Sequence, residues 1–414
     1  MFSALKNGAF VQISIGSFLL TLAFMAQEVV LGYELYRLTK DPLMLGLLGL
    51  AEALPFMALA LFGGHFADRL NRRTQMFVML ILITLAAAML AQIAPSLQKT
   101  GATSEALWII FGSVAITGFA RGLYSPAASS LRAQIIRVQD QANSAAWSAT
   151  FWQAGMLSAP VLAGYGYLKI GLQNTLWVTV ALTAATAILT LFLPSLRVER
   201  SDVDDNEGMW ASIKTGFSFV FGNKILLYSI SLDLVAVLFG GVIAILPAFA
   251  SDVLHIGPEG LGWLRTAPGA GAVLTMLLAA KFSPTTRPWR NMLIAVSGFG
   301  IATLVFALSS SFWLSMLALA LTGVFDGISV VVRQYLLQSV PPNHIRGRVL
   351  SVNSIFVSAS NELGAFESGV AAKYLGLRSS VLAGACLTLL SAIWLFNRGR
   401  VHGLSALDGK SKQT

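Results

Sequence analysis

Twelve long runs of apolar residues, separated by short polar linkers, dominate this sequence of 414 residues. A helix needs about 20 mostly apolar residues to cross the hydrocarbon core of a bilayer, and each run is long enough to do so. Charged residues make up only 11% of the chain, where a soluble domain carries roughly a quarter. We therefore predict an all-α membrane protein with twelve transmembrane helices. The predicted helices cover residues 11–36, 43–67, 75–95, 106–130, 143–168, 172–194, 225–250, 260–282, 290–310, 312–337, 349–372 and 378–397.

Lysine and arginine are distributed unevenly around these predicted spans. If both termini lie on the cytoplasmic side, 19 of the 28 basic residues fall in cytoplasmic segments, 6 fall on the opposite side and 3 lie within spans. Basic residues favour the cytoplasmic side of a membrane, so both termini are predicted to be cytoplasmic. The net charge of +9 is then a consequence of topology, and no nucleic-acid partner is expected.

The first apolar run is predicted to be a retained span and not a removable signal peptide. It is long, it contains Glu28, and it shows no clear small-residue cleavage site. The one cysteine, Cys386, lies in the last predicted span, and the four histidines are scattered, so no metal-ligand spacing is present. The nucleotide-binding pattern Gly-x-x-x-x-Gly-Lys-Ser/Thr is absent from the sequence, which argues against an ATP-driven pump. We expect no cofactor, no metal site and no enzymatic activity.

A polar segment after the sixth span separates the chain into two halves. This segment carries the longest charged stretch of the sequence and includes an amphipathic piece at 209–221. We interpret it as a cytoplasmic linker, and a regulatory site is the functional alternative. The predicted domains are a six-helix bundle at 1–194, a linker at 195–224, a second six-helix bundle at 225–397 and a cytoplasmic tail at 398–414.

The two halves contain similar glycine patterns. Residues 118–122 resemble residues 323–327 at an offset of 205 positions, and the same offset pairs Gly171 with Gly376. Internal repeats of this kind occur in secondary transporters, where the substrate site lies at the interface between repeats near the middle of the membrane. Close approach of helix backbones is a purely structural explanation of the same glycines.

The loop after the second span contains a motif of glycine, aspartate and arginine residues. Residues 63–73 read GGHFADRLNRR, which resembles the signature loop of the major facilitator superfamily: a glycine, three residues, Asp-Arg, two residues and a basic pair. Asn71 occupies a position where the family usually has glycine, so a tight turn there would rely on the tolerance of asparagine for the left-handed region. The matching residues are Gly64, Asp68, Arg69, Arg72 and Arg73.

This resemblance covers essentially the whole chain and implies two pseudo-symmetric six-helix bundles. It also implies that Asp68 is neutralised by an arginine or by amides at a helix N-terminus, and that such charge pairs close the cytoplasmic face and break when the protein opens inward. The alternative is that the arginines only anchor the topology of the loop.

A second loop narrows the resemblance. Residues 341–349 read PPNHIRGRV and are similar to the Arg-Gly-Arg loop of drug and siderophore exporters. Residues 38–46, before the second span, carry the same resemblance, and the enterobactin-exporter-like group is the nearest fit to both segments. Macrolide exporters share much of this pattern, so the substrate stays open. The resemblance implies a multi-pass protein of the bacterial cytoplasmic (inner) membrane.

Ionisable residues within spans are the candidates for mechanism. An ionisable side chain in the middle of a bilayer costs at least a few kcal/mol, so it usually faces a cavity or a partner. The resemblance implies that spans one, four, seven and ten line a central cavity. Arg121 and Asp326 correspond under the 205-residue offset, carry opposite charges, and are candidates to face each other. The predicted cavity residues are Gln27, Glu28, Arg121, Ser125, Asp233, Asp326, Arg333, Asn353, Asn361 and Glu362.

A carboxylate in a dry cavity can load and release protons near working pH. Glu28 is the preferred proton carrier, and Asp233 and Asp326 compete for this role. The structural alternative for Glu28 is a buried carboxylate satisfied by an arginine or a hydroxyl. Glu52 and Arg265 suit either a cavity or a contact between helices.

These observations predict a secondary active transporter, with proton-coupled efflux of a small amphipathic molecule (a drug or a siderophore) by alternating access. The first alternative is an importer or a lysolipid or lipid flippase of the same fold, and the second is a non-transporting receptor or assembly protein. The expected partners are a small-molecule substrate, protons and the lipid bilayer, and the protein is expected to be a monomer.

Overall fold

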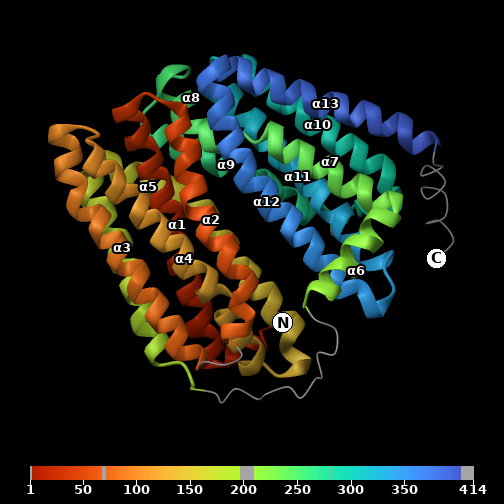
Figure 1. Cartoon of the computed structure of the whole chain (residues 1–414), viewed down its shortest axis with the longest axis horizontal. Coiled ribbons are helices and arrows are strands. Elements are labelled where there is room, and N and C mark those ends of the chain that lie inside the picture. Colours follow the sequence, from red (N-terminus) through yellow and green to blue (C-terminus); the bar gives the residue numbers. More distant parts are fainter. Residues whose placement is uncertain (1, 68–70, 196–208, 280, 402–414) are drawn as a thin grey trace. The chain divides into compact units, whose positions relative to one another are not determined.

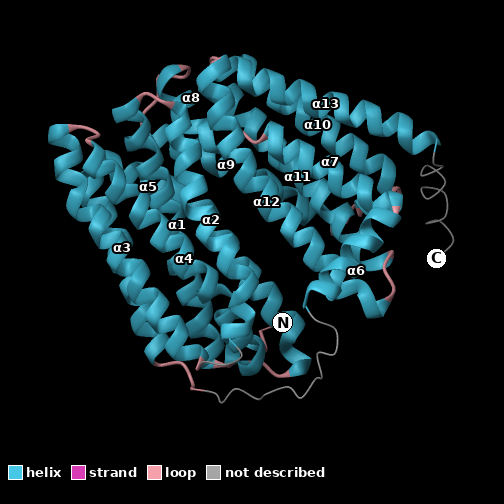
Figure 2. Ribbon diagram, in the orientation of Figure 1, coloured by secondary structure: helices cyan, strands magenta, loops and turns pink. Residues whose placement is uncertain are grey.

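The computed structural model describes residues 2–67, 71–195, 209–279 and 281–401. Within these ranges the regular secondary structure is entirely helical, as Figure 2 shows. A helix satisfies the backbone polar groups inside one segment, which a hydrocarbon environment requires. The predicted Gly64 lies in a helix, whereas the motif residues Asp68 and Arg69 lie outside the described ranges.

The described residues form thirteen α-helices, and Figure 1 uses the same labels. Those of the first half are α1 (Gly8–Thr39), α2 (Pro42–Ala67), α3 (Arg72–Thr100), α4 (Ser104–Ile135) and α5 (Gln141–Leu191). The later ones are α6 (Met209–Gly222), α7 (Lys224–Gly240), α8 (Leu246–Asp252), α9 (Pro258–Ala279), α10 (Pro288–Leu308), α11 (Phe312–Ser339), α12 (Asn343–Leu375) and α13 (Leu377–Val401). Short 3-10 helices cover Ala4–Lys6, Val138–Asp140, Ile243–Ile245 and Pro284–Thr286.

Polar side chains begin several of these helices. The Asn7 Oδ1 accepts hydrogen bonds from the first backbone amides of α1, at 3.1 and 3.2 Å. Thr103 caps α4 and Asn223 caps α7 in the same way. Such caps satisfy amides that have no partner inside the helix, so the short polar linkers set where the helices start.

All twelve predicted spans are mainly helical, but the seventh, at 225–250, is broken after Gly240, where α7 ends and a 3-10 helix and α8 follow. The fifth and sixth share α5, which breaks at Gly171, where the backbone has φ 78°. Gly376, its counterpart under the 205-residue offset, has φ 87° and separates α12 from α13. Glycine reaches this region without the steric cost that a Cβ would impose. The two halves therefore use the same backbone device after their fifth span.

Nine helical stretches of the described residues are long and apolar enough to cross a membrane. Because α5 holds two predicted spans, these stretches contain ten of the twelve. The remaining two, α9 and α12, carry more polar side chains, among them Arg265 on α9 and Glu362 on α12. Many large apolar side chains are exposed, such as Leu85, Leu317 and Ile393, as expected of surfaces that face lipid.

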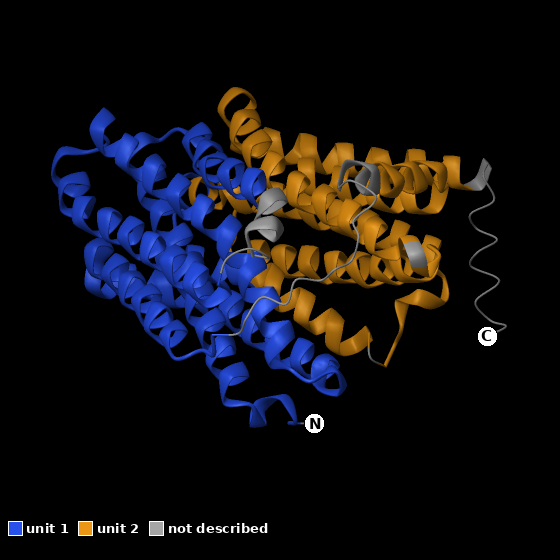
Figure 3. Ribbon diagram, turned by 60° about the horizontal axis from the view of Figure 1, so that its bottom comes forward, with its two compact units in different colours: residues 1–202, 250–266 blue, residues 203–249, 267–414 orange. Residues whose placement is uncertain are grey.

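The chain divides into two compact units, coloured separately in Figure 3. Unit 1 combines residues 1–202 with residues 250–266, so the end of α8 and the first part of α9 belong with the first five helices. Unit 2 combines residues 203–249 with residues 267–414. The domain boundaries predicted at 194, 224 and 397 stay a prediction.

Unit 1 is held together by close helix crossings. Helix α1 packs on α5 and α2 packs on α4, around a core that includes Phe10, Leu80 and Leu131. Gly118 of α4 lies so close to the backbone of Glu52 in α2 that a Cβ would not fit. Small residues allow this approach and the packing it brings.

Helices α5 and α9 make a reciprocal crossing within unit 1. Gly164 of α5 lies against the Pro258 carbonyl of α9, and Gly262 of α9 lies against the Pro160 carbonyl of α5. Neither glycine has room for a Cβ. This double contact holds the first part of α9 on α5.

Unit 2 repeats the crossing found at Gly118. Gly323, the counterpart of Gly118 under the offset, lies against the Pro268 carbonyl of α9, again with no space for a Cβ. The core of the unit includes Leu226, Met292 and Leu337 from α7, α10 and α11. The glycine pattern in the sequence therefore marks equivalent helix crossings in the two halves.

Candidate functional site

Glu28 lies on α1 and forms an ion pair with Arg265 of α9. The Arg265 side chain is 8% exposed and the Glu28 side chain is 42% exposed. A buried guanidinium is costly without a counter-charge, so Arg265 depends on Glu28 more than Glu28 depends on Arg265. Gln27, the next predicted cavity residue, is buried. The exposed carboxylate of Glu28 can therefore meet a ligand, although it already has a partner.

Arg121 of α4 forms an ion pair with Glu52 of α2. Its guanidinium also lies over two aromatic rings, 4.6 Å from the Phe24 centroid and 5.6 Å from the Phe56 centroid. Cation–π contacts of this kind hold an arginine in place. Arg121 thus joins α4 to α1 and α2, and its predicted pairing with Asp326 stays a prediction.

A polar stripe continues along α4. Ser125 is exposed, and Arg132, eleven positions after Arg121, is partly buried and donates from Nη2 to the Ser17 Oγ of α1 at 3.1 Å. Residues four, seven and eleven apart lie on one helix face. The faces of α1 and α4 that meet in unit 1 are therefore joined by arginine contacts.

The most buried ion pair among the described residues lies in unit 2. Asp233 of α7 pairs with Arg333 of α11, and their side chains are 7% and 5% exposed. Asp326, seven residues before Arg333 on the same helix, lies within electrostatic range of both. Arg333 therefore pairs with Asp233, whereas the partly buried Asp326 has no ion-pair partner within 4 Å in the part of the chain that the structure describes. We call Asp233, Asp326 and Arg333 the charged triad.

The predicted residues of α12 differ in their surroundings. Asn353 is buried, and its Oδ1 accepts no hydrogen bond from any described residue. Asn361 is exposed and donates to the Val357 carbonyl of its own helix at 3.0 Å. Glu362 is partly buried. Asn353 is thus the strongest polar candidate that α12 offers to a ligand.

The last three residues of the signature loop, 71–73, lie within the described part of the chain and contact the rest of unit 1. Asn71 has φ −62° and ψ 113°, and its Oδ1 accepts from the Arg73 and Thr74 amides at 3.1 and 3.4 Å. Asn71 is therefore an extended helix cap, and the left-handed turn considered for it does not form. Arg73 donates to the Leu193 carbonyl at 3.1 Å, and Arg72 is buried. Both arginines belong to the packing of unit 1.

Sequence reasoning missed a buried carboxylate near the end of α1. The Glu34 side chain is 2% exposed and accepts two hydrogen bonds from Arg37, from Nε at 2.9 Å and from Nη2 at 2.6 Å. The Tyr167 hydroxyl of α5 donates a third, at 2.6 Å. The spacing of Glu34 and Arg37 by three residues was the available signal, because such pairs meet on one helix face.

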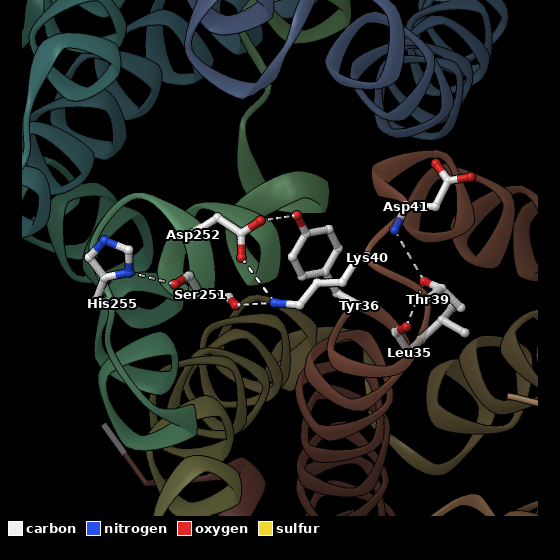
Figure 4. A network of polar contacts seen from close by, with 8 residues as sticks. All are labelled: Leu35, Tyr36, Thr39, Lys40, Asp41, Ser251, Asp252 and His255. Atoms are coloured by element: carbon white, nitrogen blue, oxygen red, sulfur yellow. Dashed lines mark hydrogen bonds and ion pairs between the residues drawn. The ribbon is translucent and has the colours of Figure 1, made fainter. Parts of the chain in front are cut away.

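Sequence reasoning also missed a polar network between α1 and α8, shown in Figure 4. The Tyr36 hydroxyl donates to Asp252 Oδ2 at 2.6 Å. Lys40, which ends α1 in the left-handed region with φ 50°, donates from Nζ to Asp252 Oδ1 at 3.1 Å and to Ser251 Oγ at 3.0 Å. Together with the α5–α9 crossing and the Glu28–Arg265 pair, this network holds residues 250–266 against helices α1 and α5 of unit 1.

The helices and their paired intramembrane charges define a multi-pass membrane protein, with no catalytic constellation among the described residues. The sequence model described as Major Facilitator Superfamily matches residues 13–365 and 229–412. The chain belongs to the major facilitator superfamily, and it is a transporter and not an enzyme. The fold class and the family predicted from the sequence are confirmed.

Two relatives similar to this chain are exporters by name. The chain is 27% identical to the multidrug efflux pump Tap of Mycolicibacterium fortuitum, over 84% of this chain and 85% of the relative. It is 25% identical to the enterobactin exporter EntS of Citrobacter koseri, over 57% and 58%.

Among solved structures, the nucleoside transporter NupG has a TM-score of 0.72 at 17% identity, covering 94% of this chain and 98% of NupG. A bacterial homolog of the human lysosomal transporter Spinster, in an inward-facing and unoccupied conformation, has a TM-score of 0.72 at 16% identity, covering 96% and 97%. At such low identity the likeness shows the shared fold alone.

Proposed function

We propose that this transporter exports small amphipathic molecules in exchange for protons, by alternating access. The observation that carries the proposal is the charged triad, in which the Asp233–Arg333 ion pair is buried and the partly buried Asp326 lies near it without an ion pair of its own among the described residues. The direction of transport is supported by the two relatives, which are named as a multidrug efflux pump and an enterobactin exporter.

Asp326 is the proton carrier in this proposal. Arg333 neutralises Asp233, so an ionised Asp326 leaves one uncompensated negative charge at a partly buried position beside a buried ion pair. Binding a proton removes that charge, and exposure of the site to the opposite side of the membrane lets the proton leave. Glu28 and Asp233 are less suited to this role, because each already has an arginine as its counter-charge.

The substrate-binding residues proposed for unit 1 are those around Arg121. Phe24 and Phe56 offer aromatic surface beside the guanidinium, while Glu28 offers an exposed carboxylate. A molecule with both apolar and polar groups matches this mixture. Gln27 and Ser125 in unit 1, and Asn353, Asn361 and Glu362 in unit 2, remain proposed cavity residues.

Alternating access requires contacts that form on one side and break on the other. We assign this role to the Tyr36–Lys40–Asp252 network on one side and to the Asp68 loop on the cytoplasmic side, with both termini cytoplasmic and the protein acting as a monomer in the bacterial inner membrane. An Asp68→Asn variant should then transport poorly at normal expression. Wild-type transport by this variant would leave the arginines of the loop as topology anchors only.

The coupling is tested with purified protein in liposomes under an imposed pH gradient, over a panel of amphipathic drugs and siderophores. Wild-type flux should follow the gradient, and Asp326→Asn should abolish this dependence while substrate exchange without a gradient persists. Glu105→Gln, which changes an exposed carboxylate in the first turn of α4, is the matched control.

Three outcomes of this assay would contradict parts of the proposal. Gradient-driven flux that survives in Asp326→Asn would move the proton to another carboxylate, and Glu28→Gln is the next variant to measure. Wild-type flux that does not depend on the gradient would remove protons from the mechanism. Gradient-driven uptake in the direction of import would replace the exporter with an importer.

A further inference from the structure

Helix α6, in the segment between the two predicted bundles, is anchored in unit 2 by one face. A Cβ added to Gly216 would lie only 2.8 Å from the Arg348 carbonyl oxygen of α12, so the two helices approach closely at this glycine. Phe217 packs against Phe356 with ring centroids 5.8 Å apart, and Val220 is buried in the core of the unit. The anchored face fixes the direction in which the opposite face points.

That opposite face lines a cavity of about 740 Å³ within unit 2. Its lining includes Lys214, Thr215 and Ser218 of α6, and Asn223 at the start of α7. Phe219 and Ile345 add apolar surface. The volume lies in the usual range of sites for small ligands, about 300–1,000 Å³. Among the described lining residues are hydrogen-bonding groups, the Lys214 ammonium and apolar side chains.

The two described segments that meet beside the cavity are basic in sequence. These segments, residues 209–224 and 339–352, contain four lysines and arginines and no aspartate or glutamate. These basic residues are Lys214, Lys224, Arg346 and Arg348. Helices α6 and α12, which carry three of them, pack together (Figure 1). The site therefore favours an anion.

The cavity also adjoins the start of a membrane span. The apolar stretch that begins at Lys224 is long enough to cross a bilayer, and Asn223, its neighbour, lines the cavity. Basic pockets at the ends of transmembrane helices suit phosphate head groups of anionic lipids. Phe219 and Ile345 supply apolar surface for the glycerol and the first methylene groups of a lipid.

We propose that this cavity binds the phosphate head group of an anionic membrane phospholipid, with Lys214 as its ammonium contact and the hydroxyls of Thr215 and Ser218 as donors. The lipid ties α6 to the beginning of α7 and α12 and thereby links the segment between the bundles to the membrane surface. This site is independent of the substrate and proton sites proposed above.

The test is native mass spectrometry of the purified full-length protein, titrated with phosphatidylglycerol, phosphatidylcholine and glycerol 3-phosphate. Phosphatidylglycerol should bind more tightly than phosphatidylcholine. Lys214→Gln should weaken phosphatidylglycerol binding about fivefold, the effect expected of one basic residue near an anionic lipid. Lys281→Gln changes another exposed lysine of unit 2, away from the cavity lining, and should leave binding unchanged.

A second variant separates filling of the cavity from loss of charge. Ser218→Phe fills the hollow and keeps Lys214, so it should weaken phosphatidylglycerol binding while the thermal melting of the protein stays at the wild-type value. Equal affinity for phosphatidylglycerol in wild type, Lys214→Gln and Ser218→Phe would overturn the proposal. Glycerol 3-phosphate that displaces the lipid at equal concentration would also overturn it, in favour of a soluble phosphate ester.

Discussion

The Tyr36 hydroxyl donates a 2.6 Å hydrogen bond to the Asp252 carboxylate and so joins the end of α1 to the end of α8. These residues lie 216 positions apart in the sequence, yet both belong to unit 1. Lys40 adds an ion pair to the same carboxylate. Asp252 therefore holds residues of the second half of the chain on the first six predicted spans, and any movement that frees α8 must break these bonds.

Tyr36→Phe should favour the conformation in which α8 is released. A hydrogen bond to a charged group contributes about 1.5–3 kcal/mol of stabilising free energy. Because Asp252 is partly exposed, we expect the free energy lost with this bond to lie near the lower end of that range. The measurement is water accessibility of a cysteine introduced near Ser251, in a background in which Cys386 is replaced by serine. Tyr33→Phe is the control, because the Tyr33 ring packs edge-on against Tyr167. Equal accessibility in both variants would show that the bond does not hold α8.

Glu34→Gln should lower the stability of unit 1. The change removes the charge that Arg37 and the Tyr167 hydroxyl share, and the expected cost is about 1–3 kcal/mol, because a buried hydrogen-bonding group is left poorly matched. Thermal unfolding in detergent measures it. Tyr167→Phe should lower the midpoint by a smaller amount, since the ion pair with Arg37 survives. A midpoint that rises in Glu34→Gln would contradict the structure.

Gly118→Ala should destabilise the crossing of α2 and α4. A Cβ at this position has no room beside the Glu52 carbonyl, and overpacking of this kind costs about 1–3 kcal/mol. Gly112 lies on the same helix with no atom within 4 Å of its ideal Cβ, so Gly112→Ala should be neutral or slightly stabilising. The yield of folded, monodisperse protein and its melting temperature compare the two variants. Similar values for both would remove the packing role of Gly118.

Arg333→Gln should harm folding more than Asp326→Asn does. Loss of the arginine leaves Asp233 and Asp326 together without a counter-charge, and breaking a buried ion pair in this way costs about 3–5 kcal/mol. Asp326→Asn removes the uncompensated carboxylate and keeps the buried pair. The comparison uses melting temperature at neutral pH. The double variant Arg333→Gln/Asp233→Asn should recover part of the loss, and no recovery would show that the two residues are not paired.

The elements of the fold were predictable because they depend on local pattern. Hydropathy located twelve mainly helical spans, since the length needed to cross a bilayer is a property of one segment, but it did not indicate the break after Gly240 in the seventh. The glycine repeat was predictable for a similar reason, and the structure shows what it does: Gly118 and Gly323 mark helix crossings, and Gly171 and Gly376 mark breaks.

The partners of the charged residues were not predictable in this way. Glu28 and Asp233 stood out as charges inside spans, but nothing in the sequence indicated Arg265 or Arg333 as their counter-charges. Glu34 and Asp252 were missed because they lie near span ends, where polar residues are common and carry little signal.

The sequence by itself determined the membrane environment, the helices and the family, because the span length, the basic-residue bias and the signature loop are each contained in short segments. Only the tertiary structure decided which charges neutralise one another. Ion pairs such as Glu28–Arg265 join helices far apart in the chain, and they form only where helix crossings bring two side chains to the same depth. That depth is set by packing, at contacts such as Gly164 against Pro258, and no single segment encodes it.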